Sequence, residues 1–399
     1  MYVFLIVVTL SFSLICLIFL LYDLFHIVKS VLGRKHIGNW INKQEWEKAV
    51  LHRTNVWIKR TPVVRQTDIS RLLLFDVLRK KNKNQNIQSW QSAALLLALT
   101  DKMRSEDISI IKKKISTILQ PEGSWKTTPK TVDCGLLSYA VLRFSDINTV
   151  NLAVEDSVRI IEQNIGIDGM IAYSSQPNAD ERFVDTLGFV CPFLVVYSKK
   201  YSKPHYADLA IRQLKIFSEH AIEPSSLLPN HAYSAKTKLP LGVYGWGRGV
   251  GWYVIGLLDS YLEYPYRESP DRLWLLNQIE KIAISYSVFQ KKDGSFGHIF
   301  QMESGYDSSA TAVMAYFYAQ CGRLFQSKKY LEISTLCLSK LMSVTRRNGA
   351  IDYCQGDTKE IGIFSQSFDL MPFAQGFATR AILSLRNTHS EDKKEFRGK

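Results

Sequence analysis

The sequence contains few of the residues that build covalent or metal-bound frameworks. Its 399 residues include only six cysteines and eight histidines, and no two cysteines form a C-x-x-C pair. Zinc sites and redox motifs depend on such spacings. We therefore predict no metal site and no disulfide framework. Scattered thiols favour a reducing compartment.

Charge is absent from the first 22 residues, MYVFLIVVTLSFSLICLIFLLY. An uncharged run of this length is sufficient for a helix to cross a bilayer. A cleavable signal peptide is the alternative, but it needs a basic start and a small-residue cleavage site, and this run has neither. We predict an uncleaved, single-pass membrane anchor over residues 1–28.

Acidic residues are scarce in the stretch that follows. Residues 29–83 hold 14 Lys and Arg against four acids, so most of the net charge of +13 lies here. Basic residues beside an apolar segment indicate a cytoplasmic domain and attract anionic lipids. A solvated basic linker is the alternative. We predict no nucleic-acid partner, because no known module interleaves this charge with aromatic residues.

Segments with the two-residue period of strands are also few. After residue 85, apolar residues recur at the three- and four-residue spacing of helices. Four loops repeat a glycine turn followed by an aromatic or apolar residue: PEGSW, GIDGMIAY, KKDGSFGH and RRNGAIDY. Such a repeat predicts stacked helical hairpins, as an open solenoid or a closed ring. We expect a linker with lead-in helices over 29–84, an all-α domain over 85–388 and a charged tail over 389–399.

Residues 244–252, YGWGRGVGW, crowd four glycines, two tryptophans and one arginine into nine positions before an apolar helix. The N-terminus of a helix attracts anions, and Arg248 can offer a planar fork to a carboxylate. Trp246 and Trp252 can stack on a ring. The stretch is thus a candidate cradle for a carboxylated ring compound. A tight loop with two core tryptophans and a surface arginine is the alternative.

Two aspartates and a histidine complete the candidate site. Asp185 interrupts the apolar helix in DERFVDTLGFVCPFLVVY, where burial would raise its pKa and let it act as an acid near neutral pH. Asp133 heads another apolar helix, and both aspartates have helix capping as the alternative explanation. His231, in LLPNHAYSA, lies just upstream of the Trp/Arg stretch.

Taken in order, these segments resemble the unsaturated rhamnogalacturonyl hydrolases and the related unsaturated glucuronyl hydrolases. WGRGVGW (246–252) resembles their W-x-R-G-N-G-W segment, and VDTLGFVCPFL (184–194) resembles their V-D-T/G-L segment with its P-F-L run. HAY (231–233) and DSSATA (307–312) resemble two further segments. The resemblance spans roughly residues 85–385.

This resemblance implies an (α/α)6 barrel of helical hairpins behind the N-terminal transmembrane helix, with the site at one mouth of the barrel. It implies an anionic oligosaccharide substrate that ends in a 4,5-unsaturated uronic acid, and it implies no metal or organic cofactor. An aspartic acid protonates C4 and a water adds at C5, after which the hemiketal opens and the glycosidic link breaks. Asp185 is carried over as the acid and water activator, and Asp133 as the second aspartate. The substrate-binding positions carried over are His231, Trp246, Arg248 and Trp252.

Two departures from the family pattern leave other functions open. Val250 replaces the usual Asn of the Trp/Arg segment, and a membrane anchor is unusual for a degradative enzyme. The main alternative is a non-catalytic, membrane-anchored glycan-binding or polysaccharide-assembly factor on the same barrel. A lyase or sugar epimerase on this ring is a third hypothesis, which the small number of histidines on apolar helices disfavours.

Overall fold

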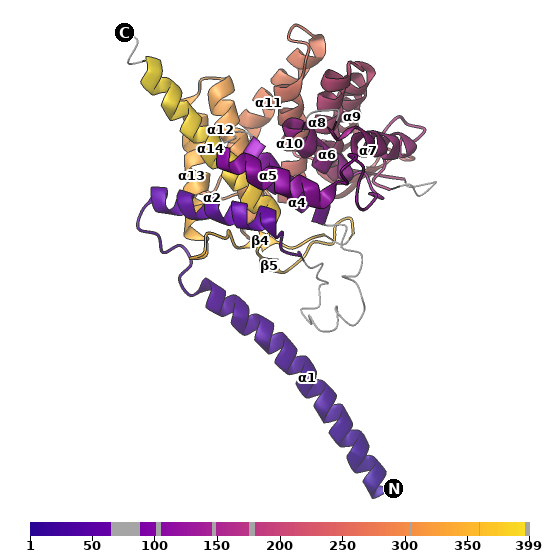
Figure 1. Ribbon diagram of the computed structural model, residues 1–399, viewed down its shortest axis with the longest axis vertical. Coiled ribbons are helices and arrows are strands. Elements are labelled where there is room, and N and C mark those ends of the chain that lie inside the picture. The colour runs from indigo at the N-terminus through magenta and orange to yellow at the C-terminus, as the bar shows by residue number, and fades with distance from the viewer. Residues whose placement is uncertain are drawn as a thin grey trace.

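The computed structural model describes residues 1–64, 88–100, 105–145, 149–174, 180–303, 305–358 and 360–395. One long helix, α1 (Tyr2–Arg34), projects from a helical body (Figure 1). Within that body the helices alternate along the chain between an outer and an inner layer. The outer helices are α2 (Lys43–Lys59), α5 (Ser105–Ile118), α7 (Asn151–Gln163), α9 (His205–Ala221), α11 (Pro270–Tyr286) and α13 (Lys328–Ser343). The inner helices are α4 (Gln88–Thr100), α6 (Cys134–Phe144), α8 (Val184–Tyr201), α10 (Gly247–Glu263), α12 (Ser308–Leu324) and α14 (Pro372–Glu395).

The inner helices form a closed ring. Each one packs on the next along the chain, and α14 packs on α4, so that the last inner helix meets the first. Their sequences are apolar nearly all round, which is the composition expected of helices covered on every side. Residues 93–99 of α4 and 186–198 of α8 are buried without a break. This arrangement confirms the predicted all-α (α/α)6 barrel.

The glycine repeat corresponds to the loops that lead from outer to inner helices. Short antiparallel bridges join residues six apart in three of these loops: Leu119 with Trp125, Ile165 with Ile171 and Thr345 with Ile351. Each loop turns at a glycine with positive φ, namely Gly123, Gly169, Gly294 and Gly349. Only glycine adopts that conformation freely. The repeated turns therefore lie at the end of the ring where the inner helices begin, which we call the mouth.

Two small sheets also lie at the mouth. Strands β1 (Glu181–Phe183), β2 (Asn230–Ser234) and β3 (Pro240–Tyr244) form an antiparallel sheet in that order. Strands β4 (Cys354–Gln355) and β5 (Phe368–Asp369) form an antiparallel pair. β1 runs directly into α8, and β3 runs almost directly into α10. The sheets therefore fix the chain on either side of the residues that begin these inner helices.

Helix α1 is 33 residues long and has no buried residue. Its most apolar 18-residue window has a mean hydropathy of 3.0, which makes it long and apolar enough to cross a membrane. In Figure 1 it leaves the body at the end that carries β4 and β5.

The domain limits predicted from the sequence remain predictions, with two structural observations beside them. Helix α2, in the stretch predicted as linker and lead-in helices, packs against α4, α5 and α14 as the outer helix of the first hairpin. The Asn/Lys-rich run RKKNKNQN (79–86), which we expect to be a loop, lies outside the described residues. The predicted charged tail, as far as Glu395, continues helix α14.

Candidate active site

The candidate residues gather at the mouth. Asp133 occupies the N-cap position of α6, and Asp185 lies in the first turn of α8. Trp246 is the N-cap residue of α10, Arg248 follows in its first turn, and His231 lies on β2. Trp252, the remaining predicted residue, lies more than one turn deeper along α10. Parallel inner helices explain this convergence, because segments far apart in sequence all begin at one end of the ring.

Asp185 is the least satisfied carboxyl group of this cluster. Its side chain is 17% exposed, and its Oδ2 atom has no hydrogen-bond partner among the described residues. It does not cap α8, because Phe183 occupies the N-cap position and no side chain caps that helix. The capping explanation for Asp185 therefore fails. Oδ2 is itself buried, and a buried carboxylate oxygen without a protein partner calls for one from outside the protein, such as a ligand or an ordered water.

Burial raises the pKa of Asp185 to about 7. The charge of Arg248 and a hydrogen bond from the Trp252 side chain act in the opposite direction, while the neighbouring carboxylate of Asp357 raises the pKa further. Desolvation disfavours the charged form of a carboxyl group, which is why burial dominates here. Near neutral pH, a substantial fraction of Asp185 therefore carries a proton.

His231 is a neutral neighbour of this acid. Its Nε2 atom lies 3.8 Å from Asp185 Oδ2, beyond hydrogen-bond distance. Burial, together with the charge of Arg248, lowers the pKa of His231 to about 4. The imidazole packs against the rings of Trp246 and Phe364, with centroids 4.5 and 5.8 Å away. Its Nδ1 atom has no hydrogen-bond partner among the described residues.

Trp246 and Arg248 hold the segment that follows β4. The Trp246 indole donates to Gln355 Oε1 at 3.1 Å. The Arg248 guanidinium donates to the carbonyl oxygens of Gln355 and Gly356 at 2.7 and 2.9 Å, and lies 3.6 Å from Asp357. Both side chains are 1% exposed. That Arg248 binds a ligand carboxylate remains a prediction, since these N–H groups are directed at protein oxygens.

The glycines around Arg248 serve close packing. A Cβ on Gly247 would lie 2.5 Å from the carbonyl oxygen of Gly297, and one on Gly249 would lie 2.7 Å from the Trp246 ring. Trp252 is 1% exposed and packs on Phe189 in the core. The tight-packing alternative thus describes the two tryptophans and the glycines in this structure, whereas Arg248 is buried rather than at the surface.

Asp133 forms the second part of the site. It is 3% exposed and accepts hydrogen bonds from Ser89, at 2.7 Å, and from Thr131. Burial raises its pKa, although these hydroxyl groups oppose the shift. It does not cap α6 with its side chain. Asp133 also lines a cavity of about 450 Å³ whose rim includes Lys126 and Lys130.

Tyr173 lies within electrostatic range of both aspartates, and the sequence analysis did not single it out. The carboxylates of Asp133, Asp185 and Asp357 all add to the rise in its pKa, which burial dominates. The Tyr173 hydroxyl therefore stays protonated near three acidic groups. Tyr173 is the aromatic residue that ends the GIDGMIAY loop, so the repeat offered a signal for it. For Gln355, which ends β4, and Asp357, which follows it, the sequence offered none, because both lie far along the chain from the other site residues.

Val250, which replaces the Asn of the resembled segment, is fully buried in the hydrophobic core. Among the described residues, no group of three or more His, Cys, Asp or Glu side chains is arranged to hold a metal ion.

Sequence comparison supplies the family. The model of glycosyl hydrolase family 88 matches residues 39–362, about four fifths of the chain. The chain belongs to glycosyl hydrolase family 88. Membership makes it a glycoside hydrolase, as the motifs predicted. No curated protein matches it in a sequence search.

Solved structures similar to this family 88 chain share its fold at low identity. A possible member of the GH105 family from Salmonella enterica is 16% identical, with a TM-score of 0.71 over 88% of this chain and 96% of that one. An unsaturated glucuronyl hydrolase specific for heparin is 14% identical, with a TM-score of 0.63 over 88% and 99%. An unsaturated glucuronyl hydrolase from Bacillus sp. GL1 is 14% identical, with a TM-score of 0.59 over 85% and 94%.

Proposed function

We propose that this glycoside hydrolase removes a 4,5-unsaturated uronic acid from the non-reducing end of an anionic oligosaccharide. Two of the similar structures are unsaturated glucuronyl hydrolases. In the proposed reaction, Asp185 gives a proton to C4 and a water molecule adds its oxygen to C5. The resulting hemiketal opens and the glycosidic bond breaks, releasing the shortened oligosaccharide.

The observation that carries this proposal is the state of Asp185. A proton donor needs a pKa near the working pH and access to the substrate. The pKa of Asp185 is raised to about 7 by burial, its side chain is 17% exposed at the mouth, and its Oδ2 atom has no hydrogen-bond partner among the described residues. After it loses its proton, the same carboxylate can accept one from the attacking water. One residue thus serves both half-steps without a second carboxylate as nucleophile.

The surrounding residues suit an anionic sugar ring. His231 is neutral, so it can accept or donate a hydrogen bond without adding charge. Tyr173 remains a hydroxyl donor beside the acids. The cavity beside Asp133, with lysines on its rim, offers room and positive charge for further sugars of the chain. Trp246, Arg248 and Trp252 are buried. We propose that they lie behind the substrate-binding surface and hold it in position.

The deciding experiment compares Asp185→Asn with Asp208→Asn on unsaturated disaccharides from pectin and glycosaminoglycan lyase digests. Asp208 is an exposed acid in the first turn of outer helix α9, so it matches the substitution in chemistry and helix position. We expect loss of the ultraviolet absorbance of the C4–C5 double bond with the unaltered chain and Asp208→Asn. We expect Asp185→Asn to be slower by about 10²-fold or more. Binding without turnover by the unaltered chain would instead support the non-catalytic hypothesis.

We further propose that α1 is retained as a membrane anchor and that the barrel lies on the cytoplasmic side. The length and apolar surface of α1 support the anchor, and the basic residues that follow it support this orientation. Protease added to intact cells should spare a C-terminal tag, while detergent should expose it. Protection lost without detergent would place the barrel outside.

A further inference from the structure

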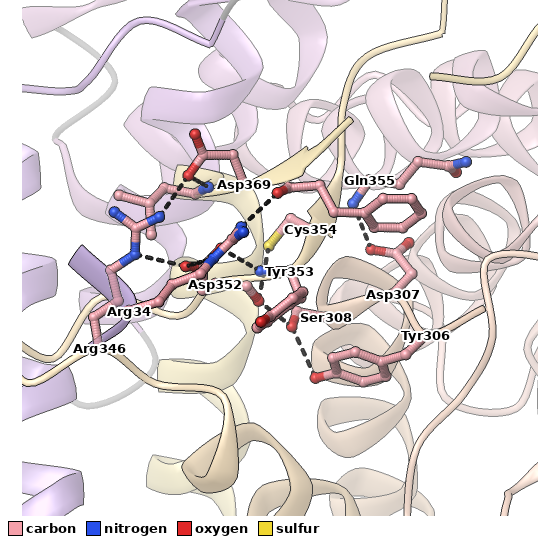
Figure 2. Close-up of polar contacts among 12 residues, drawn as sticks. Arg34, Tyr306, Asp307, Ser308, Arg346, Asp352, Tyr353, Cys354, Gln355 and Asp369 are labelled. Carbon is pink, nitrogen blue, oxygen red and sulfur yellow. Dashed lines mark hydrogen bonds and ion pairs between the residues drawn. The ribbon is translucent and has the colours of Figure 1, made fainter. Parts of the chain in front are cut away.

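The end of helix α1 is joined to the mouth of the barrel. Arg34, its last residue, donates from Nε and Nη2 to the two carboxylate oxygens of Asp352, each at 2.9 Å. Nη2 also donates to the Phe368 carbonyl oxygen at 2.7 Å, and the guanidinium lies 4.4 Å from the centre of the Tyr353 ring. Figure 2 shows these groups together. Two-pronged pairing of this kind fixes orientation as well as distance.

The partner of Arg34 is itself held firmly. Asp352 has a fully buried side chain and also accepts from Arg346 Nε at 2.6 Å, while Arg346 reaches Asp369 at 2.8 Å. Burial alone would raise the pKa of Asp352, but the hydrogen bonds from Arg34 and Arg346 hold it below its usual value. Beyond α1, the Gly38 amide donates to the Thr345 carbonyl oxygen at 2.9 Å. Helix α1 is therefore tied to the body on both sides of its end.

The joint lies close to the candidate active site. Gln355 is the third residue after Asp352, a span of at most about 10 Å of extended chain. Gln355 receives the Trp246 indole, and its carbonyl oxygen receives Arg248. Asp307, which caps α12, accepts from the Gln355 amide at 3.0 Å, as Figure 2 also shows. The anchor thus meets the body at the end where substrate enters.

Helix length then sets the height of the mouth above the bilayer. The uncharged run of α1 spans about 30 Å, which is the thickness of the hydrocarbon core. From Asp23 to Arg34 the helix adds about 18 Å, of which the headgroup layer takes about 5 to 8 Å. Ile27, Val31 and Leu32 are apolar and exposed, which favours a still lower position. The mouth therefore lies on the order of 10 Å from the membrane surface.

The space between α1 and the mouth is open. A cleft of about 550 Å³ separates Ile27, Val31 and Arg34 on the helix from Tyr306 and Phe368 on the body. A polymer free in solution has little room to approach from this side, whereas a chain rising from the membrane meets the mouth directly.

We propose that the mouth of the barrel faces the membrane and that the substrate is an anionic glycan attached to a lipid of that membrane. The inference rests on the proposed function and deepens it by naming where the unsaturated end is presented. Arg34 is a positioning residue in this scheme, because it orients the barrel through Asp352 and contacts no reacting atom. Holding the mouth beside a lipid-linked substrate raises the local concentration of that substrate at the active site, as linking does for any pair of reactants.

The test uses the full chain in lipid nanodiscs, whose two faces are both accessible. One substrate is an unsaturated lyase-derived disaccharide free in solution, and the other is the same disaccharide coupled by a short linker to phosphatidylethanolamine in the disc. A variant carries an 18-residue helical insert between Val28 and Lys29. Five full turns raise the barrel by about 27 Å without rotating the joint.

We expect the insert to leave the rate on the free disaccharide unchanged and to lower the rate on the lipid-linked one by about tenfold or more. Arg34→Ala should also lower the lipid-linked rate relative to the free rate, whereas Lys35→Ala, which removes the same charge from the adjacent exposed residue, should not. Equal rates of the insert variant and the unaltered chain on the lipid-linked substrate would overturn the proposal. Absence of turnover on both substrates would instead refute the proposed function, and this inference with it.

Discussion

Asp185 meets two demands that usually conflict, since a buried acid keeps its proton but loses contact with its substrate. Here the side chain as a whole is 17% exposed although its Oδ2 atom is buried, and its surroundings raise its pKa to about 7. The first turn of α8 places it there without using it as a cap. Its position therefore follows from two features. It lies at the start of an apolar helix, and the ring places the starts of the inner helices together at the mouth.

The first residue-scale prediction concerns the pH dependence of activity. Only protonated Asp185 can donate to C4, so kcat/KM should fall as the pH rises through about 7. Initial rates on an unsaturated disaccharide between about pH 5 and 9 would measure this. A rate that climbs steadily with pH would instead indicate that Asp185 acts as its carboxylate from the start.

The same raised pKa has a consequence for stability. The folded pKa of about 7 lies above the unfolded value of about 3.9, so the unfolded chain holds fewer protons in this interval and stability falls as pH rises through it. Asp185→Asn cannot ionise. Relative to the unaltered chain, it should gain up to about 4 kcal/mol in unfolding free energy between pH 4 and pH 8. Urea unfolding at the two pH values measures the difference, and a pH-independent difference would contradict the raised pKa.

Sequence reasoning at this scale finds residues that break a local pattern. Asp185 interrupts an apolar helix, and Trp246 and Arg248 crowd a glycine-rich stretch, so each is visible along the chain. Asp357 is ordinary in its own segment, and only the tertiary fold brings it beside Arg248. The direction of the Arg248 guanidinium, toward carbonyl oxygens, was equally invisible, because those oxygens belong to every residue type.

At the scale of elements, the glycines of α10 differ in how much space each leaves for a side chain. Gly247 leaves no room for a side chain, since a Cβ there would lie 2.5 Å from the Gly297 carbonyl oxygen and 2.8 Å from the Ala310 Cβ. At Gly251 the nearest atoms belong to the Val313 side chain, at 3.4 Å and beyond, which is ordinary contact. Close approach of α10 to its neighbours thus depends on the first glycine more than on the second.

Alanine at these two positions should therefore have opposite effects. Gly247→Ala should destabilise the protein by about 1 to 3 kcal/mol and reduce activity, because it displaces the start of α10. Gly251→Ala should be neutral or stabilise by about 0.5 to 1 kcal/mol, since alanine favours the helix. Thermal unfolding and initial rates measure both. Equal destabilisation by the two variants would show that the packing at Gly251 is tighter than these distances imply.

The elements were more predictable than their contacts. Periodicity predicted the helices after residue 85, and the glycine repeat predicted their pairing into hairpins, because both signals are local. Ring closure by α14 on α4 was implied only by the family resemblance, since hairpin repeats also build open solenoids. The strands of two to five residues were missed, because strands so short carry almost no alternation.

At the scale of the whole molecule, a buried ionic network ties three inner helices together. Arg380 of α14 donates to both carboxylate oxygens of Asp259 on α10, at 2.7 and 3.2 Å. Between them, the Tyr316 hydroxyl of α12 donates to Asp259 at 2.8 Å. The side chains of Arg380 and Asp259 are 1% and 0% exposed. Asp259 lies eleven residues after Arg248, about 17 Å along α10, so the network lies well below the mouth.

This network yields the last prediction, which separates ring stability from catalysis. Arg380→Met leaves the Asp259 carboxylate buried without its cation and should cost about 3 to 5 kcal/mol, lowering the unfolding temperature. Adding Asp259→Leu removes that charge and should recover most of the loss, because an apolar pair fills the same space. Below the unfolding transition, both variants should keep near-normal rates. A double variant no more stable than Arg380→Met would mean that the pair contributes by specific attraction, and a loss of rate in the folded variants would mean that the far end of the ring influences the mouth.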